Sequence, residues 1–227
     1  MRDIDELDLK LLFPKEIHDA IEIQKNLSKN LKIQKFETKN IQYIGGLDVS
    51  YVDDYALGVL VILDSNLNIV EIISQKARGE FPYIPGLLAF REAPVIIECL
   101  RKSSIRPDVL IFDGQGIAHP RKFGIASHVG VLLDVPSIGV AKSRLYGTCD
   151  KPTHVGDAEP IYDRVGNLIG YCYLSKKNTN PIYISPGHLC DPDSALSFVK
   201  SLMRGYKLPE PTRLAHIYTQ KLKSGTQ

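Results

Sequence analysis

Apolar residues gather in three extended runs in the first third of the chain. The runs cover residues 41–52, 55–64 and 67–78, and the short segments VDD and DSN lie between them. Runs of this length are typical of strands, and Asp, Ser and Asn favour the turns that join strands. The pattern therefore predicts three antiparallel strands that follow one another as a meander.

After this meander, the pattern changes to helices that alternate with short apolar strands. Residues 87–103 have helical spacing, and Pro94 within them predicts a kink or a new start, because proline lacks the N–H that a helix needs. Residues 108–113 and 137–142 predict strands, with a helix over 124–134 between them. Wholly apolar strands next to helices are typical of a parallel arrangement.

Both ends of the chain are predicted to be helical. Residues 15–35 have apolar positions along one side, and two further helices are predicted over 191–205 and 211–224. Asp191 and Thr212 stand where the side-chain caps of these last two helices are expected. The chain therefore carries helices before and after its strands.

Turn residues are frequent between 148 and 186, where short strands are predicted only near 167–175 and 181–185. All these elements together predict an α/β fold with one mixed sheet, in which three antiparallel strands precede parallel ones and helices flank the sheet. We expect the chain, 1–227, to form a single domain in which 148–186 is the least regular part.

The composition is that of an ordinary globular protein. The chain has 227 residues, of which 44% are hydrophobic and 24% charged. Its beginning lacks the pattern of a signal peptide, and no apolar stretch approaches the roughly 18 residues of a membrane span. The four cysteines form no C-x-x-C pair. We therefore expect a cytoplasmic protein with reduced thiols and no membrane partner, and we expect it to be a monomer.

The formal net charge is only +2, but the charge is unevenly distributed. Basic residues exceed acidic ones in three zones, 25–39, 101–144 and 200–223. In the first zone the lysine spacing would form one basic stripe if the segment is helical, although a merely solvated helix face is the alternative. The three zones together favour a polyanionic partner such as nucleic acid.

Two acids stand on apolar strands. Asp48 lies between Leu47 and Val49, and Asp113 ends the run 108–113. A buried carboxylate is costly unless it is paired or bound to a metal, and neighbouring strands can bring two such acids together. A hard cation such as Mg²⁺ prefers these oxygen ligands. Alternatively, Asp48 accepts hydrogen bonds from a nearby turn and Asp113 caps the loop that follows it.

The segment DGQGIAHPRKFG, residues 113–124, combines an acid, glycines and bases. Glycines let backbone N–H groups approach a ligand closely, and His119, Arg121 and Lys122 could then contact phosphate. The spacing is neither that of a dinucleotide-binding loop nor that of a Walker A loop. The chain also lacks the G-x-S-x-G pattern of many serine hydrolases.

Two other residues each allow two interpretations. Pro82 and Pro85 restrict the backbone around Tyr83, whose ring could either pack into the core or enter a stack of bases. Glu92 begins the segment EAP in a helix, where spacing alone favours an ordinary solvated acid.

Four blocks of sequence follow one another along the chain: GGLDVSYV, FPYIPGLLAFREAP, DGQGIAHPRKFGIASHVG through PSIGVAKSRLYG, and TRLAHIYT. Taken in this order, they resemble the endonuclease V family, whose nucleases act at deaminated adenine (inosine). The resemblance extends roughly over residues 40–220. It implies a ribonuclease H-like fold, in agreement with the strand order predicted above.

The resemblance also implies roles for individual residues. Asp48 and Asp113 match the metal-binding acids, Glu92 a third catalytic acid, Lys142 a lysine that meets a phosphate, and His216 a histidine near the metal. Tyr83, held by Pro82 and Pro85, matches a wedge that fills the gap left by the displaced base. The matches to the lining of the base pocket are Gly86, Leu88, Gly114, Gly116, His119, Gly124 and Ile125. Gln115 receives no role.

The resemblance thus implies a nuclease that requires Mg²⁺, with Mn²⁺ as a substitute. It implies cleavage of the second phosphodiester bond 3′ to the deaminated adenine, which leaves 3′-hydroxyl and 5′-phosphate ends. We expect DNA that contains deoxyinosine as the substrate, with inosine-containing RNA as the alternative.

Two other classes of protein remain as alternatives. An actin-like ATPase shares the early meander, but the glycine expected soon after Asp48 is replaced by Val49, Ser50 and Tyr51. A non-catalytic nucleic-acid-binding protein of the same fold would not need the three acids. Their presence favours catalysis.

Overall fold

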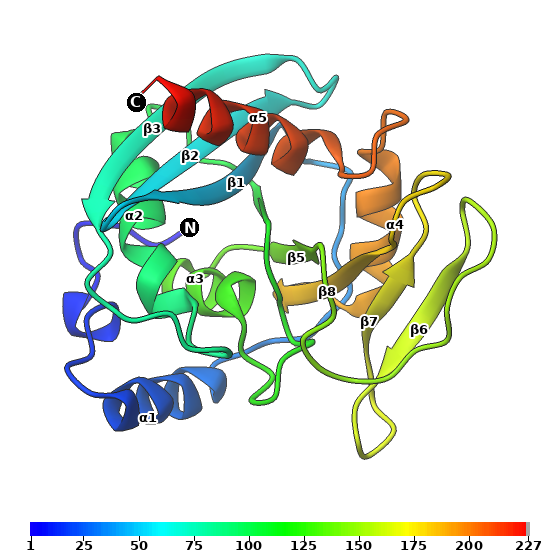
Figure 1. Cartoon of the computed structure of the whole chain (residues 1–227), viewed down its shortest axis with the longest axis horizontal. Coiled ribbons are helices and arrows are strands. Elements are labelled where there is room, and N and C mark those ends of the chain that lie inside the picture. The colour runs from blue at the N-terminus through cyan, green and yellow to red at the C-terminus, as the bar shows by residue number, and fades with distance from the viewer. Residues whose placement is uncertain (226–227) are drawn as a thin grey trace.

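A single eight-stranded sheet runs through the molecule in the computed structural model, which describes residues 1–225. The strands lie in the order β3-β2-β1-β4-β5-β8-β7-β6 (Figure 1). Their bounds are β1 Tyr43–Val52, β2 Tyr55–Asp64, β3 Ile69–Arg78, β4 Val109–Phe112, β5 Ser137–Ala141, β6 Ala158–Tyr162, β7 Leu168–Tyr173 and β8 Ile182–His188.

The two halves of the sheet differ in strand direction. β1, β2 and β3 form the predicted antiparallel meander, and β4 lies parallel to β1 and to β5, as predicted. β8, β7 and β6 then continue the sheet in antiparallel fashion. The predicted α/β class with one mixed sheet is therefore confirmed, although β6 was not predicted.

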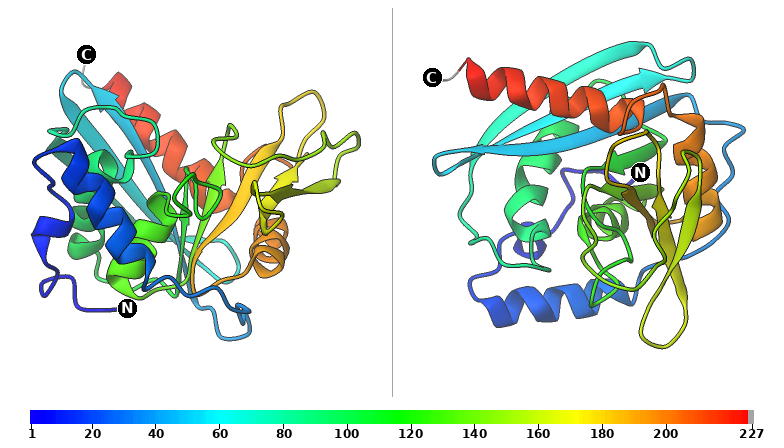
Figure 2. Two further views of the ribbon diagram at one scale, coloured as in Figure 1. Left: turned by 90° about the horizontal axis from the view of Figure 1, so that it is seen from below. Right: turned by 45° about the vertical axis from the view of Figure 1, so that its right-hand side comes forward.

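Helices cover both faces of the sheet (Figures 1 and 2). On one face, α2 and α3 pack on the side chains that include Leu60 and Leu110. On the other face, α5 covers Val59 and Val61, and α4 covers the far half of the sheet. α1 lies outside α3. The helix bounds are α1 Ile17–Ser28, α2 Ala89–Lys102, α3 Ile125–Leu133, α4 Pro192–Ser201 and α5 Glu210–Ser224, with a short 3₁₀ turn at Leu9–Leu11.

The first helix is shorter than its sequence pattern predicts, because α1 ends at Ser28 rather than near residue 35. The chain beyond it bonds to distant elements instead: the Lys32 carbonyl accepts from the Leu189 N–H, and the Phe36 N–H donates to the Ser194 hydroxyl. The lysines from Lys29 onward therefore lie outside the helix. The helix over the whole segment, on which one basic stripe depended, does not form.

The predicted caps and the proline have mixed outcomes. Asp191 caps α4 and accepts from the Ser194 N–H, as predicted. Thr212 does not cap α5, which begins after Pro209; its hydroxyl donates within the first turn to the Pro209 carbonyl. α2 continues through Pro94, where a new start was an alternative.

Three of the four cysteines are buried, and Cys149 is half-buried; all four are free thiols. In the described part of the chain, no helix is long and apolar enough to cross a membrane.

A histidine inside the core makes a pH prediction. His128 of α3 is fully buried between the rings of Phe90 and Phe123, and burial lowers its pKa to about 4. An unfolded chain protonates this ring near pH 6.5, so the unfolded state binds more protons and stability falls as the pH falls from about 6.5 to about 4.

Between about pH 7.5 and about pH 5, the protonation of His128 should lower the unfolding free energy of the original protein by about 2 kcal/mol. We expect His128→Leu to lack this loss. Urea unfolding of both proteins at the two pH values measures the difference. The same pH dependence in both proteins would show that His128 contributes nothing.

Candidate active site

Asp48 and Asp113 lie side by side because their strands are parallel neighbours. Leu47 of β1 pairs with Phe112 of β4, and the Asp113 N–H donates to the Leu47 carbonyl at 3.1 Å. The next residue on β1 is Asp48, which is 5% exposed. Both acids therefore stand at one end of the parallel pair, where strand register alone brings them together.

Helix α5 holds Asp48 from the face opposite α2. The Thr219 hydroxyl donates to Asp48 Oδ2 at 2.5 Å, and His216 Nδ1 lies 3.2 Å from the same oxygen. Gly46 permits this close approach, since a Cβ there would stand 2.2–2.7 Å from the backbone of Pro211. Sequence reasoning missed Thr219, although it follows His216 by three residues and so shares its helix face.

Lys142 provides the positive charge beside these acids. It directly follows β5, and its Nζ lies 2.5 Å from Asp113 Oδ2 and 3.5 Å from His216 Nδ1. The ammonium group opposes the effect of burial on Asp113. Burial prevails, however, and the pKa of Asp113 is raised to about 6.

Glu92 is the third acid of the cluster. It is buried on α2 and accepts from the Tyr51 hydroxyl at 3.3 Å. Burial, followed by the charges of Asp113 and Asp48, raises its pKa to about 8. The interpretation of Glu92 as a solvated surface acid, based on spacing alone, is therefore wrong.

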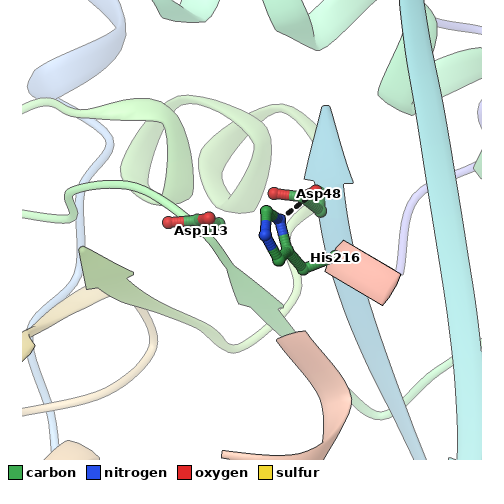
Figure 3. A group of neighbouring side chains, drawn as sticks. All are labelled: Asp48, Asp113 and His216. Carbon is green, nitrogen blue, oxygen red and sulfur yellow. Dashed lines mark hydrogen bonds and ion pairs between the residues drawn. The ribbon is translucent and has the colours of Figure 1, made fainter. Parts of the chain in front are cut away.

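The three side chains in Figure 3 could hold a metal ion. Ligand atoms of Asp48, Asp113 and His216 all lie within 4.8 Å of one another, the only such group of three in residues 1–225. They come from β1, from the end of β4 and from α5 (Figure 3). Carboxylate oxygens suit hard divalent cations, and a cation would offset the repulsion between the two carboxylates.

A pocket opens beside Asp113 between two loops. We call residues 81–88 the proline loop and residues 113–124 the glycine loop. The lining includes most of the predicted base-pocket residues together with Gln115, whose Nε2 donates to the Ser143 carbonyl. From the prediction, the pocket wall includes Tyr83, Pro85, Gly86, Leu88, Gly114, His119, Gly124 and Ile125. Asp113 and Lys142 also line it.

One residue of the predicted base pocket, Gly116, does not line it. Gly116 lies behind the wall, where a Cβ would stand 2.0 Å from the Pro186 carbonyl oxygen. Pro82, predicted to hold Tyr83, lines a different depression. Conversely, Gln24, Ser143 and Leu145 line the pocket without having been predicted. Gln24 comes from α1, and Ser143 and Leu145 come from the segment after β5, so their place in the pocket depends on tertiary packing that no local sequence pattern indicates.

Tyr83 projects from the proline loop into solvent. Its side chain is 68% exposed, so the interpretation of this ring as part of the core is wrong. The basic side chains of the glycine loop, for which phosphate contacts were suggested, have partners within the protein. His119 is buried and uses both ring nitrogens within the protein, Arg121 donates to the Gly86 carbonyl, and Lys122 pairs with Asp163 at 2.9 Å.

The mixed sheet flanked by helices, with an acid cluster at the end of its central parallel strands, is of the ribonuclease H-like class. The model of the endonuclease V family matches residues 25–217, and the chain belongs to that family. It is therefore a nuclease that hydrolyses phosphodiester bonds.

Relatives in sequence and structure agree with this. Endonuclease V of Kosmotoga olearia is 43% identical over 209 residues, which is 91% of this chain and 92% of that protein. The crystal structure of endonuclease V from Bacillus subtilis superposes with a TM-score of 0.90 at 29% identity and covers 96% of this chain and 97% of that one.

A third relative was solved with nucleic acid. Endonuclease V of Ciona intestinalis, in complex with a 24mer DNA that contains an inosine followed by a ribo-adenosine, has a TM-score of 0.83 at 27% identity. The match covers 93% of this chain and 99% of that chain.

The close packing of α5 on β1 leads to a prediction. We expect Gly46→Ala to push Pro211 away, and with it His216 and Thr219, because a Cβ cannot stand 2.2 Å from a backbone oxygen. Overpacking of this kind costs about 1–3 kcal/mol of unfolding free energy, and nuclease activity should fall with it.

Gly79→Ala is the matched control, because a Cβ there meets its nearest neighbour at 3.5 Å. Thermal unfolding and nuclease assays of both variants measure the effect. Equal stability of the two variants would contradict the packing argument.

Proposed function

We propose that this protein is a metal-dependent endonuclease that cleaves DNA at the second phosphodiester bond 3′ to a deoxyinosine and leaves 3′-hydroxyl and 5′-phosphate ends. One observation carries the proposal: Asp113 belongs both to the acid cluster and to the wall of the pocket. A nucleotide base held in that pocket would keep its own strand beside the acids. The Ciona relative bound to inosine-containing DNA supports the same substrate.

Backbone groups of the two loops would recognise the base. Hypoxanthine differs from adenine in its carbonyl oxygen at C6 and its protonated N1. N–H and C=O groups of a rigid loop can distinguish these edges, since each unmatched group in a dry pocket costs about 1–3 kcal/mol. Gly86, Gly114 and Gly124 leave the backbone of the two loops without side chains where the base would lie.

The acids and the side chains beside them would each have a separate role in the reaction. Asp48, Asp113 and His216 would hold Mg²⁺, or Mn²⁺ in its place, and a bound cation of this kind helps to activate water and to stabilise charge on the phosphate. Thr219 keeps one Asp48 oxygen oriented. Lys142 would offset charge on the scissile phosphate, and Glu92 would position the attacking water.

Tyr83 would act as the wedge of the enzyme. Pro82 and Pro85 hold the exposed ring at the mouth of the pocket, from which it could fill the gap left by a displaced base. Displacement of a base costs a few kcal/mol and less at a mispaired base, so the lesion itself would favour entry.

The proposal is tested with end-labelled oligonucleotides that carry one inosine, one set of DNA and one of RNA, with Mg²⁺ or EDTA. We expect a nick one nucleotide beyond the inosine, in Mg²⁺ only, with DNA cleaved faster than RNA. Faster cleavage of RNA would reverse the choice of substrate. Cleavage in EDTA would exclude the metal role.

Asp113→Asn is the matched variant for this experiment. We expect no cleavage above background, because the amide lacks the charge that holds a cation. The amide also does not repel the neighbouring acids. In EDTA at neutral pH the variant should be at least as stable as the original protein, since it removes one of the mutually repelling buried acids. Full activity of the variant would contradict the metal assignment.

Tyr83→Ala tests the wedge. Loss of one stacked ring should weaken binding to inosine-containing duplex DNA by about 1–3 kcal/mol, and exposure of the ring predicts an unchanged melting temperature. Fluorescence anisotropy and thermal unfolding measure the two quantities. Unchanged affinity would mean that Tyr83 does not contact the DNA.

A further inference from the structure

A buried amide on α1 reaches both loops of the pocket. Gln24 is 1% exposed, whereas its neighbours Lys25 and Asn26 are exposed. It stands one residue before the segment that matches the family. Its burial therefore calls for polar partners, and these come from the proline loop and the glycine loop.

Gln24 uses all three of its amide positions. Its Nε2 donates to the Gly86 carbonyl of the proline loop at 3.1 Å and to the Phe123 carbonyl of the glycine loop at 3.3 Å. Its Oε1 accepts from Arg121 Nε at 2.6 Å. One side chain of the pocket lining thus bonds to both loops.

The Gly86 carbonyl is the point where the two loops meet. Besides Gln24, it accepts from Arg121 Nη2 at 2.6 Å and from His119 Nε2 at 2.9 Å. The second ring nitrogen of His119 accepts from the Arg121 N–H, so the proton lies on Nε2. Burial, together with Arg121, lowers the pKa of His119 to about 4 and keeps the ring neutral.

These contacts connect two walls that belong to different parts of the chain. The glycine loop is attached directly to β4 and α3, whereas the proline loop joins β3 to α2. Gln24 lines the same pocket and fixes Gly86 relative to Phe123. A base recognised by backbone groups on both walls is sensitive to this spacing, because hydrogen bonds weaken sharply with distance and angle.

We propose that Gln24 is a positioning residue that sets the width of the base pocket and thereby the preference for hypoxanthine over adenine. The inference rests on the proposed function. If Gln24 only anchored α1, its loss would lower stability and reduce all cleavage alike. A positioning role instead lowers the preference for inosine.

Two variants separate the contacts. Gln24→Met keeps the length of the side chain and removes the whole amide, and Gln24→Glu keeps an acceptor for Arg121 but loses both donated hydrogen bonds. Asn26→Met is the matched control, an amide replaced on the exposed side of the same helix. The measured quantity is the ratio of kcat/KM for single-stranded DNA with inosine to that for the same strand with adenine, alongside the melting temperature.

We expect both Gln24 variants to lower this ratio about tenfold, the size of effect expected when one hydrogen bond between the pocket walls and the base is lost. Asn26→Met should keep the original ratio. A folded Gln24 variant with the original ratio would overturn the inference, and if Gln24→Met does not fold, Gln24→Glu decides. Absence of any preference in the original protein would instead overturn the proposed function.

Discussion

The repulsion between buried carboxylates is the constraint on which the rest of the site depends. The register of β1 and β4 forces Asp48 and Asp113 together, and α2 adds Glu92 to the same cluster. Without compensation, burial of several like charges is costly, and the pKa values of Glu92 and Asp113 are raised. The surrounding structure compensates through the Lys142 ammonium on Asp113 and the Thr219 hydroxyl on Asp48. A divalent cation would complete this neutralisation.

The sheet and its two helical layers supply these groups from different directions. Lys142 comes from the end of the next parallel strand, and Thr219 comes from α5 on one face. Glu92 comes from α2 on the other face. The approach of α5 requires Gly46, where no larger residue leaves room for the backbone of Pro211. An acid cluster formed in this way depends on tertiary packing as much as on the identity of the acids.

The sequence predicted those parts of the molecule that local patterns determine. Long apolar runs with turn formers between them determined the meander, and wholly apolar strands determined the parallel pair. The predicted end of α1 was wrong because residues after Ser28 bond to Leu189, at the end of β8, and to Ser194 of α4. No local pattern indicates these contacts. Spacing placed Glu92 in solvent for the same reason: its burial depends on α2 covering the end of β1.

The candidate site shows the same division. The resemblance supplied residues that lie together, but neither it nor the spacing indicated Thr219 or Gln24. Hydroxyl and amide side chains are common, and their partners here are a carboxylate 171 residues away and two loop carbonyls. Only the folded chain identifies such contacts.

The two walls of the pocket are coupled to the acid cluster to different degrees. The glycine loop begins with Asp113 itself, so a shift of this wall moves a carboxylate of the cluster. The proline loop meets that wall through the Gly86 carbonyl, where donors from Gln24, His119 and Arg121 converge. Under the proposed function, a base that forced the walls apart would strain these hydrogen bonds, and a base that matched both walls would leave them intact. The proposed recognition of the base and the proposed cleavage would then both depend on Asp113.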